Sequence, residues 1–171
     1  MLKENVEKAL NAQIELEAYS SQLYLSMASW SEKNGYNGSS QFLYEHADEE
    51  RGHMLKLFHY INDRDAHAIV PSLDKPPHEF ESIKAVFTEV LNHERMISES
   101  INNLVGTCID ARDYTTQNFL QWYVSEQIEE ENLAKTNLDK LVLLGDDKAN
   151  MYMFDKEMAE MSASFADGTA E

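Results

Sequence analysis

The stretch Glu49-Glu50-Arg51-Gly52-His53 places a glutamate and a histidine three residues apart. On an α-helix, residues with this spacing share one face about a turn from each other. The Glu50 carboxylate and the His53 imidazole can then reach one metal ion. The E-x-x-H pattern arises often by chance, so its meaning depends on the helices around it.

Hydrophobic periodicity predicts four long helices, at about 4–33, 39–64, 82–111 and 115–144, and a shorter one at about 147–163. Turn-forming residues at 34–38 and a polar connection at 110–114 separate the helices of each half. Between the halves, residues 65–79 hold all three prolines, so no regular helix is expected there. We predict an all-α four-helix bundle with a long crossover between the second and third helices and a short fifth helix at the C-terminus.

The end of the chain adds further expectations. Gly145 is predicted to end the fourth helix, and Asp146 or Asp147 to begin the fifth. The fifth helix carries an apolar seam at alternating steps of three and four residues: Met151, Phe154, Met158, Met161 and Phe165. This seam packs either on its own bundle or on neighbouring subunits. Residues 1–165 form one expected domain, with a disordered tail at 166–171.

Composition excludes several classes of protein. A formal net charge of -17 disfavours nucleic acid and anionic membranes as partners and suits a protein that attracts cations. The N-terminus lacks a signal-like apolar run, and no stretch is long enough to span a membrane, so a cytoplasmic location is expected. The single cysteine, Cys108, excludes an internal disulfide and a cysteine-rich metal site, and it is expected to be a buried thiol.

A polar residue interrupts the apolar stripe of every long helix. These residues are Glu17, Glu50, Glu94 and Gln127, the last followed one turn later by Glu130. A carboxylate on a core stripe costs several kcal/mol unless it is paired or binds metal. Four helices that share this feature indicate a common site.

The sequence spacings support that site independently. Glu17 and Glu50 are 33 residues apart, as are Glu94 and Gln127, and the midpoint of each pair falls at the turn of its own hairpin. Each hairpin therefore brings its polar pair to one height. Glutamates from two helices, with an i, i+3 pair from each of the other two, are the ligand pattern of dinuclear iron bundles. Oxygen-rich ligands with one imidazole suit iron better than structural zinc.

These residues resemble the bacterial non-haem ferritins. The likeness covers roughly residues 1–165 and rests on Glu17 with Tyr24, on Glu50-x-x-His53, on Glu94, and on the run Gln121-Trp122-Tyr123-Val124-Ser125-Glu126-Gln127-Ile128-Glu129-Glu130-Glu131. The resemblance implies a hollow homo-oligomeric shell of 24 subunits, with the fifth helix at its four-fold axes. It also implies ferroxidase activity, in which Fe(II) is oxidised with dioxygen or hydrogen peroxide, and storage of ferric oxyhydroxide inside the shell.

The resemblance also assigns roles. Glu17, Glu50 and His53 would hold one iron, and Glu50 would bridge to a second iron bound by Glu94 and Glu130, with Gln127 close by. Tyr24 would hydrogen-bond near this centre and take part in electron transfer. A third iron site is matched by Glu49, Glu126, Glu129 and Glu130, for which plain surface acidity is the alternative interpretation. His46, one turn before Glu50, is expected beside the metal ligands rather than among them. The remaining histidines are expected at solvated or edge positions: His59, His67, His78 and His93.

Some features depart from related families. Haem-binding bacterioferritins carry Met where Arg51 stands, and a second E-x-x-H where this chain has Gln127 and Glu130, so no haem is expected. Residues 116–120 lack the acidic groups that line the iron channels of animal ferritins, which leaves the entry route open. A rubrerythrin-like peroxidase would need paired cysteines, and a non-catalytic shell subunit would bind no iron in a titration.

Overall fold

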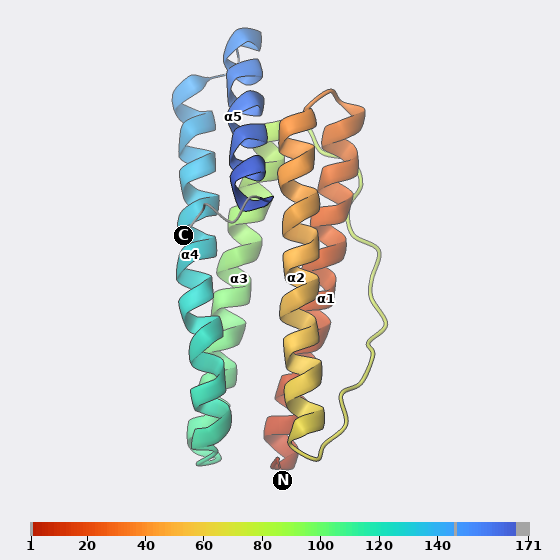
Figure 1. The fold of residues 1–171 in the computed structure, drawn as a ribbon, viewed down its shortest axis with the longest axis vertical. Coiled ribbons are helices and arrows are strands. Elements are labelled where there is room, and N and C mark those ends of the chain that lie inside the picture. Colours follow the sequence, from red (N-terminus) through yellow and green to blue (C-terminus); the bar gives the residue numbers. More distant parts are fainter. Residues whose placement is uncertain (1, 146, 167–171) are drawn as a thin grey trace.

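Five α-helices and no strand occur in the part of the chain that the computed structural model describes, residues 2–145 and 147–166. They are α1 (Glu4–Lys33), α2 (Asn37–Asp63), α3 (Ile83–Asp110), α4 (Tyr114–Leu144) and α5 (Lys148–Ala166). The first four form the bundle, and α5 lies against one end of it (Figure 1). The predicted all-α architecture is confirmed. No described helix combines the length and the apolar character needed to cross a membrane.

The four long helices form two antiparallel hairpins joined by a long crossover. The segment between α2 and α3 runs along the outside of the bundle, so that α2 and α3 are parallel (Figure 1). Side chains of α1 bind this segment. Asn11 accepts a hydrogen bond from the Ile69 amide at 2.8 Å, and Ser26 donates one to the Pro77 carbonyl at 2.6 Å. The crossover predicted from the prolines is therefore present and fixed to α1.

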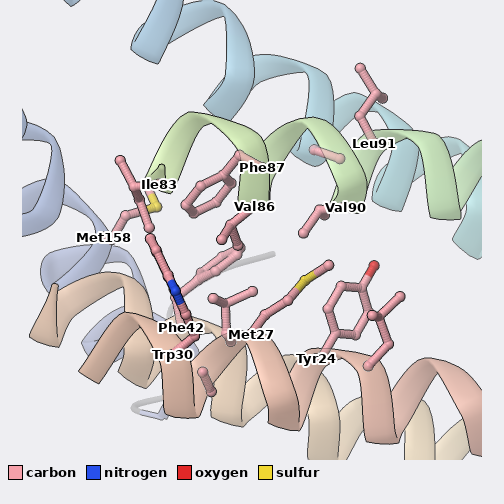
Figure 2. Packing of buried hydrophobic residues seen from close by; sticks show 14 of the residues in the cluster. Tyr24, Met27, Trp30, Phe42, Ile83, Val86, Phe87, Val90, Leu91 and Met158 are labelled. Carbon is pink, nitrogen blue, oxygen red and sulfur yellow. The ribbon is translucent and has the colours of Figure 1, made fainter. Parts of the chain in front are cut away.

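Two apolar clusters fill the bundle. One contains Met27, Phe42 and Phe87, and Figure 2 shows its side chains meeting between α1 and α3. The other contains Leu10 and Leu57 at the opposite end. Each long helix passes from one cluster to the other where its stripe carries a polar residue: Glu17, Glu50, Glu94, and Gln127 with Glu130. The polar side chains thus form a layer across the middle of the bundle.

Helix α5 packs on its own bundle. Phe154 and Met158 are fully buried in the first cluster, and the Phe154 ring meets the Phe87 ring edge-on at 5.2 Å between centroids. Phe154 and Met158 of the apolar seam therefore pack on their own bundle, which is the first of the two predicted alternatives. The side chain of Phe165 lies outside the described part, as do Asp146 and residues 167–171 of the expected tail.

The start of α2 differs from the prediction. The expected turn included Asn37 and Gly38, yet both are helical. Asp155 on α5 explains the difference, because its carboxylate accepts hydrogen bonds from the Gly38 amide at 3.0 Å and the Ser39 amide at 2.8 Å. Amides of a first helical turn have no partner within their own helix, so an acceptor from elsewhere stabilises the earlier start.

The end of α4 agrees with the prediction. Gly145 has a φ of 69°, which favours glycine, and its amide bonds to the Leu141 carbonyl at 3.2 Å. Asp147 accepts a hydrogen bond from the Ala149 amide at 2.9 Å, in the manner of an N-cap.

Candidate metal centre

Three ligand atoms converge in the polar layer. His53 Nδ1 lies 3.4 Å from Glu50 Oε2 and 4.0 Å from Glu17 Oε2. All three side chains are buried, and α1 supplies one while a single turn of α2 supplies the other two. The i, i+3 spacing of Glu50 and His53 therefore acts as the sequence predicted, and the helical hairpin brings Glu17 to the same height.

Two of these oxygens are the least satisfied polar atoms of the layer. Glu17 Oε2 and Glu50 Oε2 are buried and have no donor group of another residue type beside them, so that without metal only a proton held between the two carboxyl groups can satisfy them. In the described part of the chain, no lysine or arginine forms an ion pair with Glu17, Glu50, Glu94 or Glu130. Buried carboxylate oxygens without a donor or a basic partner are strongly unfavourable. A cation beside His53 Nδ1 would satisfy both oxygens, so the donor set fits a metal ion.

Glu94 faces the same layer but has other partners. Tyr24 donates a hydrogen bond to Glu94 Oε1, and Gln127 Nε2 donates one to Glu94 Oε2 at 3.0 Å. All three side chains are buried. Glu94 does not join the groups of closely converging ligand atoms among the described residues. Each Glu94 oxygen keeps a second lone pair for an ion beside the hydrogen bond that it accepts.

Two further groups extend the site along α2 and α4. Ligand atoms of His46, Glu49 and Glu130 lie within 4.8 Å of one another, as do those of Glu49, His53 and Glu126. His46 Nε2 is 3.9 Å from Glu130 Oε2, a position compatible with the expectation that His46 lies beside the metal ligands. Glu49 is exposed and Glu126 half-buried, whereas exposed Glu129 joins neither group.

Burial and mutual repulsion hold protons on these acids. Burial and the charge of Glu50 raise the pKa of Glu17 well above its usual value. Burial and the charge of Glu94 do the same to the pKa of Glu50. Burial, with Glu94 and Glu49 nearby, raises the pKa of Glu130 to about 9. In the absence of metal, carboxyl groups of the polar layer therefore stay protonated near neutral pH. A bound cation would displace those protons.

Comparison with known proteins identifies the family. The model of the ferritin-like domain matches residues 7–144. The chain is 46% identical over 162 residues to a probable bacterial non-heme ferritin-like protein of Haemophilus influenzae, covering 95% of this chain and 98% of that protein. It is 42% identical over 164 residues to the bacterial non-heme ferritin of Campylobacter jejuni, covering 96% and 98%. The chain belongs to the ferritin family.

A solved structure agrees with this membership. The open pore ferritin of Archaeoglobus fulgidus superposes on this ferritin chain with a TM-score of 0.91 at 38% identity, covering 93% of this chain and 98% of that one. Iron storage is the function that this family membership supports.

Two buried groups of this ferritin chain were missed or misplaced by sequence reasoning. His93 was expected at an edge, yet it is buried, and its Nε2 lies 2.7 Å from the Ser20 hydroxyl. Gln13, not singled out at all, is 1% exposed and donates a hydrogen bond to Glu17. Its spacing of four residues from Glu17 is the signal that could have revealed it.

Proposed function

We propose that this ferritin chain is a ferroxidase that oxidises Fe(II) with dioxygen or hydrogen peroxide at a dinuclear centre within the bundle. The observation that carries the proposal is the pair of buried, unpartnered oxygens, Glu17 Oε2 and Glu50 Oε2, facing His53 Nδ1. Iron is here the substrate and the stored cargo. The mixed set of carboxylates with one imidazole suits Fe(II) and Fe(III).

The residues divide between two iron positions. Glu17, Glu50 and His53 would bind the first ion, whose three ligands already converge. Glu94 and Glu130 would bind the second, with Gln127 beside it and Glu50 between the two ions. Glu94 joins no group of converging ligand atoms, so it has to move towards the other ligands of the second position before it binds. We therefore expect the first position to need less rearrangement than the second.

The surrounding charges favour oxidation. Two Fe(II) ions lose one electron each, and dioxygen takes up both electrons and two protons to give hydrogen peroxide. Buried carboxylates stabilise the ferric product more than the ferrous substrate, because Fe(III) carries the greater positive charge. The hydroxyl of Tyr24, held on Glu94, is placed to exchange an electron and a proton with the second position.

A third iron position is proposed at the exposed side of the layer. Glu49, Glu126, Glu129 and Glu130 would form it, and the closeness of Glu49 to Glu126 and to Glu130 supports this assignment. Glu129 has the weakest support, because it joins neither group. The exposure of Glu49 suits a route by which ferric ions leave the centre.

The assembly and location follow from the family. We propose a homo-oligomeric shell of 24 subunits in the cytoplasm that stores ferric oxyhydroxide without haem. Residues 1–165 would act as the single domain of each subunit, and Ala166, expected to begin the tail, is instead the last residue of α5.

Two measurements test the centre. Anaerobic titration should show two tightly bound Fe(II) ions per wild-type chain, and aerobic addition should give rapid growth of ferric absorbance. Glu50→Ala removes a ligand of both positions and should slow oxidation at least about tenfold. Glu15→Ala, an exposed glutamate of α1, is the matched control and should react like the wild type. A Glu50→Ala protein that oxidises Fe(II) at the wild-type rate would refute the centre, and a chain that binds no iron would revive a passive shell subunit.

A further inference from the structure

Glu17 presents its two oxygens to different surroundings. Oε2 is buried without a hydrogen bond and lies 4.0 Å from His53 Nδ1. Oε1 accepts a hydrogen bond from Gln13 Nε2 at 2.8 Å. One oxygen is thus occupied by the protein, and the other faces the proposed iron position.

Gln13 is itself held in one orientation. The Ser100 hydroxyl of α3 donates a hydrogen bond to Gln13 Oε1 at 2.7 Å. Because an ionised carboxylate only accepts, the amide must direct its NH2 group towards Glu17, and its oxygen then takes the Ser100 hydroxyl as donor. The reversed amide would set its oxygen against the carboxylate and would leave the Ser100 hydroxyl to act as an acceptor.

Burial strengthens the hydrogen bond between Gln13 and Glu17. Gln13 is 1% exposed, as is Glu17, so water does not compete for the bond between them, whereas the bond from Ser100 is only partly buried. Once a metal ion has displaced the Glu17 proton, the acceptor is charged, and the hydrogen bond from Gln13 is stronger than one between neutral groups. The bond from Ser100 links the two halves of the bundle, because Ser100 lies on α3 and Gln13 on α1.

We propose that Gln13, oriented by Ser100, is a positioning residue that holds Glu17 Oε1 and directs Oε2 alone at the first metal ion. The inference rests on the proposed metal centre. It assigns Glu17 a single coordinating oxygen. A coordination position on the ion then stays free for the oxidant or for water. Without the amide, the carboxylate is free to turn and offer both oxygens, or to keep its proton and bind weakly.

Co(II) is a suitable probe, because it is stable in air at this kind of site and its visible absorption falls as its coordination number rises. Apo-protein titrated with Co(II) should show two binding steps per wild-type chain. In Gln13→Leu, the first of these steps should weaken about tenfold or more. The second step should keep its wild-type affinity, and the spectrum of the first ion alone should change.

Matched variants separate this role from a folding defect. Ser100→Ala should weaken the same step in the same direction, and Ser100→Thr, which keeps the hydroxyl, should restore it. Gln22→Leu, an exposed glutamine on the same helix, should bind both ions like the wild type. Thermal unfolding of each apo-protein monitors the fold.

Three outcomes would count against the inference. Wild-type affinities and spectra in Gln13→Leu would overturn it and leave the metal centre intact. Equal weakening of both steps together with a lower melting temperature would show a structural role only. A wild-type chain that binds no Co(II) would overturn the metal centre, and the inference would fall with it.

Discussion

At the scale of single residues, the acids of the polar layer are tolerable without metal only because they hold protons. Glu17, Glu50 and Glu130 share a buried space with no lysine or arginine paired to them among the described residues. Charged together they would repel one another strongly in surroundings that screen poorly. Raised pKa values are the physical response, and they couple stability to pH.

The metal-free protein should lose stability as the pH rises from 7 to 9. The pKa of Glu130 is about 9 in the folded chain, against a usual value of 4.5, so in this window the folded state holds a proton that the unfolded state has lost. Each such group costs up to about 1.4 kcal/mol of stability per pH unit. Glu17 and Glu50 act in the same direction.

His46 and His93 do not contribute to the change in stability between pH 7 and 9. Burial lowers the pKa of His46 and of His93 to about 4, so they affect stability only below their usual value of 6.5. Calorimetry of apo-protein should show a melting temperature that falls from pH 7 to 9. Glu130→Gln should flatten that slope, and the exposed Glu99→Gln should leave it unchanged. A melting temperature that is constant or rises over this range would contradict the prediction.

At the scale of the elements, periodicity predicted most helix bounds because each long helix buries one stripe. It missed the start of α2, because the acceptor that stabilises Asn37–Gly38 as helix is Asp155, more than a hundred residues away in sequence. It also missed Gln13 and misplaced His93. A polar residue bonded to another buried side chain cannot be distinguished in sequence from a solvated one. The carboxylates were found because acids on all four stripes have no ordinary explanation.

The contact between α2 and α5 depends on Gly38. A Cβ at this position would lie 1.8 Å from the Asp155 carbonyl oxygen and 2.8 Å from the Ala159 nitrogen. Backbone atoms cannot turn aside, so Gly38→Ala should push α5 from the bundle and cost about 1–3 kcal/mol. Gly106→Ala, inside α3 with no atom within 4 Å of the added Cβ, should instead stabilise the chain by about 0.5–1 kcal/mol.

Chemical denaturation of the two variants checks this prediction. Protection of the Phe154 region from hydrogen exchange should fall in Gly38→Ala alone. Equal stabilities for both alanine variants would mean that α5 does not pack as closely as its contacts with α2 indicate.

At the scale of the whole molecule, the proposed oxidation takes place within one chain, whereas storage requires an assembly of chains. The polar layer is built within one chain, so the proposed oxidation needs no partner residue. Storage needs an enclosed volume, which one 19.6 kDa chain cannot supply. The end of the bundle where α4 meets α5 exposes Val142, Leu143, Tyr152 and Met153. Because exposed apolar groups that gather on one surface mark interaction sites, we expect another subunit to cover this end.

A variant that loses the assembly but keeps the metal centre is the sharpest test of the proposed shell. Leu143, 87% exposed, and Tyr152, 73% exposed, can be replaced together by glutamate with little effect inside the bundle. Where subunits meet, the added charges would be buried against one another, so the 24-subunit particle should dissociate into smaller oligomers in sedimentation. Each chain should still bind two Co(II) ions and oxidise Fe(II), yet the ferric product should precipitate instead of remaining soluble. A variant that keeps the full-sized particle would show that this end of the bundle is not an essential subunit contact. Loss of Co(II) binding on dissociation would show that the centre depends on assembly after all.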